Sequence, residues 1–254
     1  MIEENHDEDE IKDQVSNELS LNVLHNIYEP FIYMIILAAF NILSLTQPRP
    51  LIMSVVNNFE QNIPEAIKVI ESWSLRFLVT TGFGSAKLEN MYSGLAYKIS
   101  QGEITSIQEM KDENSLSLVP SDNNFKESLK SYSFKKSSLA RYLLVEIEKV
   151  MSDSDISEYI PNENPDEVNL EHILPKSYDN QNWGNYSEEE HRSFSNRLGN
   201  LTIMLSEDNT VADQGAFNSK KGLYELSDLK VTNMIADYDE WTTEQITDRQ
   251  RKLS

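Results

Sequence analysis

The chain has 254 residues, 39% of them hydrophobic, and carries 42 acidic against 22 basic side chains, a formal net charge of -20 at pH 7. This length provides a buried core for one large domain or two ordinary ones, and the charge excludes a basic nucleic-acid coat protein. The absence of cysteine excludes a disulfide framework, a thiolate zinc site and a cysteine nucleophile, and it fits a cytoplasmic protein.

Residues 1–18 are predicted to form a disordered acidic arm. They hold eight acidic side chains and one lysine, so they cannot bury enough apolar surface to offset the entropy of ordering. The arm is also the reverse of a cationic signal peptide. The longest apolar stretch, Phe31 to Leu45, has about 15 residues, whereas a membrane-spanning helix needs about 20. We therefore predict a buried helix there and no membrane partner.

Apolar residues then recur at intervals of three and four, which places them on one face of a helix. The clearest sets are Leu88, Met91, Leu95 and Ile99, followed by Leu139, Leu143, Ile147 and Val150. This pattern predicts a helical domain over residues 19–150. The domain ends at an acidic segment, residues 151–167, in which Pro161 and Pro165 discourage helix. We interpret that segment as a linker.

Two β-compatible runs follow the linker. Val168 to Ile173 has a β-compatible composition, and Leu198 to Leu205 is apolar and partly β-branched, which is typical of strands. Between them, Ser187 and Glu190 have the spacing of a capping box, which predicts the start of a short helix. The chain is therefore predicted to be a mostly helical α+β protein, with a second domain over residues 168–254.

Of the four histidines, one has neighbours that indicate chemistry. His6 lies in the acidic arm, His25 lies among apolar residues, and His191 follows three glutamates on a face expected to be solvated. We interpret each of these three as structural or as surface. His172 stands near the end of a predicted strand and follows Glu171. Most Glu-His pairs of this kind are a strand-end histidine beside a surface carboxylate with no catalytic role. The pair alone therefore does not identify a site.

Further motifs in the second domain supply the context. They are Glu-His-Ile-Leu-Pro at 171–175, Leu-Gly-Asn-Leu-Thr at 198–202, Asn209, Phe217 with Lys220, and Trp241 with Ile246 and Arg249. Together they resemble the His-Asn-His nucleases, also called ββα-metal or His-Me finger nucleases. The specific likeness is to the C-terminal domain of the GmrSD-type modification-dependent restriction endonucleases. It covers residues 168–254, a weaker likeness extends through the preceding helical region, and Gln214 stands where the family commonly has Asn.

The resemblance implies a ββα-metal fold for the second domain and hydrolysis of phosphodiester bonds in DNA. In this reading His172 is the general base, because an imidazole of pKa about 6.5 is largely unprotonated near neutral pH. By the same resemblance, Asn200 orients its ring. Glu171 and Asn209 offer oxygen ligands for one Mg²⁺ or Mn²⁺ ion. Because neighbouring strand residues point to opposite faces, Glu171 and His172 can serve one phosphate only if the strand frays or bends there.

Two lysines and three residues near the C-terminus complete the set. Lys220 and Lys221 are candidates for binding the flanking phosphates, with a solvated surface as the equal alternative. The Phe-x-x-Lys spacing of the family falls on Lys220. Trp241, Ile246 and Arg249 are predicted to pack the terminal helix onto the nuclease core.

Charge and family together indicate partners. A net charge of -20 predicts weak binding of a DNA duplex by this chain alone, since phosphate neutralisation by Lys and Arg supplies most non-specific affinity. Full-length members of the resembling family carry an N-terminal nucleotide-hydrolysing domain that senses modified DNA, and this chain shows neither its Asp-Gly-Gln-Gln-Arg signature nor a Walker loop. The resemblance therefore implies the nuclease half of an anti-phage restriction system. The alternatives are a non-catalytic helical scaffold subunit and a nuclease that acts on RNA or single strands.

Overall fold

The computed structural model describes residues 39–80, 85–152, 168–205 and 215–254. Within these ranges the protein is mostly helical and has one two-stranded sheet, so the predicted α+β class is confirmed. No helix in the same ranges combines the length and the apolar character needed to span a membrane. The predicted acidic arm and nearly all of the predicted linker lie outside the described residues.

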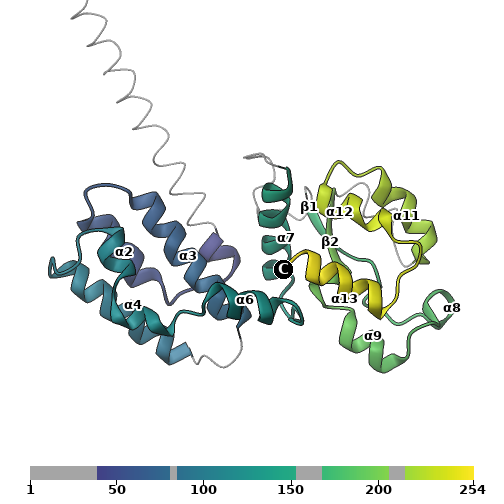
Figure 1. The fold of residues 1–254 in the computed structure, drawn as a ribbon, viewed down its shortest axis with the longest axis horizontal. Coiled ribbons are helices and arrows are strands. Elements are labelled where there is room, and N and C mark those ends of the chain that lie inside the picture. The colour runs from purple at the N-terminus through teal and green to yellow at the C-terminus, as the bar shows by residue number, and fades with distance from the viewer. Residues whose placement is uncertain (1–38, 81–84, 153–167, 206–214) are drawn as a thin grey trace, which may run out of the picture.

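Helices α2 (Arg49–Asn58), α3 (Ile63–Val79) and α4 (Ser85–Ser100) pack together in the N-terminal part of the described chain (Figure 1). The periodic residues predicted on α4, namely Leu88, Met91, Leu95 and Ile99, are all buried, as their spacing requires. A hydrogen bond of 2.8 Å between the hydroxyls of Ser74 and Tyr92 joins α3 to α4. Helix α2 packs against both.

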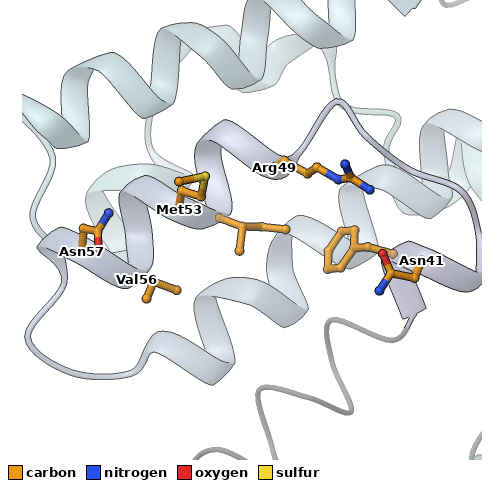
Figure 2. Close-up of a pocket in the computed structure, with 7 residues that line it drawn as sticks. Asn41, Arg49, Met53, Val56 and Asn57 are labelled. Atoms are coloured by element: carbon orange, nitrogen blue, oxygen red, sulfur yellow. The ribbon is translucent and has the colours of Figure 1, made fainter.

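A mostly apolar hollow of about 500 Å³ lies on α2. Figure 2 shows Arg49, Met53, Val56 and Asn57 of this helix around it, together with Asn41. Met53 and Val56 are 64% and 44% exposed. Helix α2 and the sheet lie at opposite ends of the long axis (Figure 1), so this hollow is separate from the site described below.

Three short elements, α5 (Ile107–Lys111), η1 (Asn114–Leu118) and α6 (Asp122–Leu129), come next in the chain. They lead to the long helix α7 (Ser137–Ser152), which lies beside the sheet. On α7, Leu139 and Leu143 are buried, whereas Val150 is 83% exposed, so the prediction for Val150 was wrong. The last turn of α7 buries Glu148 instead, because its carboxylate accepts the backbone N–H groups of Lys230 at 3.0 Å and Val231 at 2.7 Å.

The sheet pairs β1 (Val168–His172) with β2 (Leu201–Leu205) in antiparallel register, with His172 opposite Leu201. Both strands were predicted, but the second begins three residues later than expected. Residues 198–200 form a 3₁₀ turn, η3, in which a Cβ at Gly199 would collide with the carbonyl oxygen of Ile246. Only glycine lets the terminal helix approach the backbone so closely.

The remaining helices cover the sheet and the loops around it (Figure 1). They are α8 (Asn180–Trp183), α9 (Glu188–Phe194), α11 (Phe217–Glu225), α12 (Lys230–Asn233), η4 (Met234–Asp237) and α13 (Thr243–Lys252). Helix α9 begins at the predicted capping box of Ser187 and Glu190. Trp241, Ile246 and Arg249 are buried as predicted. The guanidinium of Arg249 donates to the carbonyls of Gly199 and Leu201, each at 2.8 Å.

Residues upstream of the predicted linker also pack on the second domain. Helix α7 lies against β1, β2 and α12. The amide of Gln250 donates to the carbonyls of Leu129 at 2.6 Å and Tyr132 at 3.1 Å. The backbone N–H of Phe134 donates to the carbonyl of Asn196 at 2.7 Å. The segment from α6 to α7 therefore supports the loop that precedes β2.

Candidate nuclease site

His172 is the last residue of β1, and its ring is buried. Its Nε2 lies 3.3 Å from Oδ1 of Asn196, in the loop between α9 and η3. Burial lowers the pKa of His172 to about 4, and the positive charges of Lys176 and Lys220 lower it as well, against the opposing effect of the Asn196 hydrogen bond. The imidazole is therefore neutral near pH 7, as a proton acceptor must be.

Asn200 does not contact this ring, which corrects the expectation that its amide orients His172 directly. Its Oδ1 accepts from the N–H of Leu174 at 2.8 Å and from Nε1 of Trp241 at 2.9 Å. Its Nδ2 donates to the carbonyls of Leu174 and Ser195, both at 2.9 Å. These four bonds use the whole capacity of an amide, so Asn200 holds the backbone that follows His172 rather than the ring.

Asn196 is the ring partner that sequence reasoning missed. It comes four residues before Asn200 in a polar loop, where asparagine is common for turn formation alone. Its position depends on the 2.7 Å backbone hydrogen bond from Phe134, more than sixty residues away in the chain. No spacing in the sequence indicates such a contact.

Glu171 lies at the preceding position of β1 and contacts helix α11. Its side chain is 11% exposed, and its Oε1 lies 2.7 Å from Nζ of Lys220. Burial raises the pKa of the Glu171 carboxyl, and the neighbouring Lys220 ammonium opposes that rise. Strand pairing continues through His172, so Glu171 and His172 project to opposite faces of β1.

Lys220 is buried, which corrects its prediction as a ligand of flanking phosphates. Its side chain is 1% exposed, and its Nζ donates to Glu171, to the carbonyl of His172 at 3.1 Å and to that of Ile173 at 3.4 Å. An ammonium has three N–H donors, and all three have partners. Lys221 points to the surface instead, with its Nζ 3.4 Å from Asp239.

The proposed metal ligands are described only in part. The carboxylate of Glu171 is a donor that Mg²⁺ accepts, but it projects from the opposite face of β1 to His172 and is paired with Lys220. Asn209, the second predicted ligand, and Gln214 lie outside the described residues. Within the described ranges, no group of three or more His, Asp or Glu side chains is placed to hold an ion.

His191 is buried and so does not lie on a solvated face as expected. Its Nε2 lies 2.7 Å from the carbonyl oxygen of Pro175. Its ring packs edge-to-face with the ring of Tyr178, with ring centroids 5.3 Å apart. The residue ties α9 to the loop after β1. Its role is structural, which was one of the two predicted alternatives, the other being a surface residue.

Comparison with known proteins assigns the family. Residues 119–254 match the family model described as GmrSD restriction endonucleases, C-terminal domain. No curated protein matches this chain. The matched region covers more than half of the chain, includes every predicted site residue and begins before α6. The chain therefore belongs to the GmrSD restriction endonuclease C-terminal domain family.

Proposed function

We propose that this chain is a Mg²⁺-dependent DNA endonuclease module, the nuclease half of a modification-dependent restriction system. The observation that carries the proposal is the neutral, oriented ring of His172 at the end of β1, inside the region that matches the family. Recognition of the modified DNA is assigned to a partner, a nucleotide-hydrolysing sensor domain or subunit. The nuclease chemistry is assigned to residues of this chain.

His172 is proposed to take the proton of the attacking water. When Nε2 carries the ring proton and donates to Oδ1 of Asn196, the lone pair on Nδ1 is left to accept that proton. A pKa of about 4 makes the free imidazole a weak base. The negative charge of a bound phosphate stabilises the imidazolium and so raises this pKa toward the working pH.

Glu171 is proposed to hold the metal ion together with Asn209. Because Glu171 and His172 project to opposite faces of β1, this role requires the end of β1 to bend when metal and substrate bind. When bound, Mg²⁺ supplies stabilisation of the charge on the phosphate and on the departing 3′ oxygen. Lys220 positions Glu171 and favours its ionised form, because its ammonium lowers the pKa of that carboxyl. Asn200 keeps the backbone after His172 in place through its bonds to Leu174.

The test is nicking of a supercoiled plasmid by the wild type and by His172→Ala, with and without Mg²⁺. Loss of a general base is expected to lower the rate by about 10²- to 10⁴-fold. Lys111→Ala is the matched control, since Lys111 is exposed on α5. Thermal unfolding of each protein checks that the fold is retained.

The same assay separates the alternatives. Equal cleavage by the wild type and His172→Ala would reject the assigned base. Cleavage of RNA or single-stranded DNA in preference to the duplex would reassign the substrate. No cleavage of any of the three with Mg²⁺ or Mn²⁺ would support a non-catalytic scaffold.

A further inference from the structure

Three segments that lack acidic residues meet around His172. Acidic side chains make up 42 of the 254 residues, yet residues 128–145, 172–178 and 191–205 contain none. The first segment holds four basic side chains, and the third holds two. In an acidic protein this local composition creates a region where an anion is not repelled.

Backbone and side-chain hydrogen bonds join these segments. Ser133 pairs with Arg197 in an isolated antiparallel bridge, and the N–H of Phe134 donates to the carbonyl of Asn196. The side chain of Asn196 in turn contacts the ring of His172. The basic residues next to these contacts therefore belong to the chain segments that surround the proposed reaction centre.

Four cations occupy such positions. Lys135 and Lys136 directly follow Phe134, Arg197 directly follows Asn196, and Lys176 comes four residues after His172. The three lysines are exposed, and Lys176 acts electrostatically on His172. None of the four forms an ion pair with any acidic residue that the structure describes, although some other cations do. The paired ones include Lys130, Lys221 and Lys252.

Arg197 is also held in a fixed orientation. Its guanidinium lies over the ring of Phe194, 4.4 Å from the centroid, and the side chain is partly buried. Stacking restricts the guanidinium before a ligand arrives, so less entropy is lost when it binds. A planar guanidinium offers paired N–H donors that match two oxygens of one phosphate.

We infer that Lys135, Lys136, Lys176 and Arg197 form the surface that binds the phosphate backbone of the substrate beside the scissile bond. The inference rests on the proposed function for the location of that bond. It assigns the phosphate-binding role away from Lys220, whose donors are used inside the protein. It also reconciles nucleic-acid binding with a net charge of -20.

The experiment compares the full chain with Lys135→Gln/Lys136→Gln and with a matched control, Lys87→Gln/Lys111→Gln. The control removes the same charge from exposed lysines on α4 and α5. Binding to a fluorescent duplex is measured by anisotropy across a range of salt concentrations, in EDTA so that no cleavage occurs. Each lost phosphate contact reduces the magnitude of the negative slope of log K against log salt by about 0.9. The magnitude is therefore expected to decrease by roughly 2 for the test variant alone.

Equal slopes for the test variant and the control would overturn the inference, as would a failure of the wild type to bind duplex at low salt. Because the measurement involves no cleavage, it separates the inference from the proposed function. A selective loss of slope in a protein that never cleaves DNA would keep the surface and reject the nuclease. Normal cleavage by wild type and test variant, with unchanged salt dependence, would keep the nuclease and reject the surface.

Discussion

Two groups of polar side chains belong to the segments that meet near the end of β1, and they differ in what they contact. Lys220 and Asn200 belong to the motif that resembles the family, and their hydrogen-bonding groups are used by protein atoms. Lys135 and Lys136 lie outside that motif and are exposed. The difference teaches that much of the motif builds the site, while exposed residues outside it are free, within the described part of the chain, of the internal hydrogen bonds that occupy Lys220 and Asn200.

The largest expected effect tests the buried group. Lys220→Met would leave the carboxylate of Glu171 without its 2.7 Å ion-pair partner. Removing one member of a buried pair costs about 3–5 kcal/mol of unfolding free energy, and urea denaturation measures it. Lys221→Met, at the neighbouring position whose side chain is 29% exposed, is the control and should change stability by less than about 0.5 kcal/mol. Similar losses for both variants would contradict the division between buried and exposed groups.

A second prediction uses the titration of His172. Its pKa falls from 6.5 in the unfolded chain to about 4 in the folded protein, chiefly through burial. Between these values the unfolded chain binds a proton that the folded chain does not, so stability rises with pH and is lost as the pH drops. The shift corresponds to at most about 3 kcal/mol. Urea unfolding of wild type and His172→Gln from pH 4 to 7 should show a shallower pH dependence in the variant.

An unchanged pH dependence in His172→Gln would show that the ring is not held neutral by burial. Unfolding at a fixed pH near 7 is the internal reference, because the histidine is neutral in both states there. A general acid instability shared by both proteins would then be attributed to other groups.

A third prediction concerns the ring partner. Asn196→Ala removes the acceptor that faces Nε2 of His172 and is expected to lower kcat/KM by about 10-fold, the equivalent of one hydrogen bond of roughly 1.4 kcal/mol. Asn196→Asp keeps an acceptor oxygen and should restore activity. Because a carboxylate stabilises the imidazolium and raises the pKa of His172, the pH–rate profile of Asn196→Asp should shift to higher pH. Equal rates for the alanine variant and the wild type would exclude a positioning role.

The smallest expected effect sharpens the description of the exposed group. Arg197→Lys keeps the charge but loses the stacked, planar guanidinium above Phe194. The slope of log K against log salt should stay the same, while affinity for the duplex falls by about 2- to 5-fold, since the stacking contribution is roughly 0.5–1 kcal/mol. Anisotropy titrations at several salt concentrations measure both quantities. Unchanged affinity would mean that charge alone accounts for the contribution of Arg197.

Several elements could be predicted because their causes are local. Short β-compatible runs predicted both strands, and Ser187 with Glu190 predicted the start of α9. The beginning of β2 was misplaced, because Gly199 and Asn200 are held in a 3₁₀ turn by contacts from α13 and from Trp241. Those contacts involve residues more than forty positions away, which strand propensity does not register.

The candidate site divides in the same way. The sequence by itself determined the family and singled out His172 and Glu171 as candidates for the chemistry, because those depend on residue type and spacing. Only the tertiary structure decided that Lys220 turns inward and that Asn196 faces the imidazole. The physical reason is that a lysine or asparagine is suited equally to solvent and to a buried hydrogen bond, and the packing of distant segments decides between them.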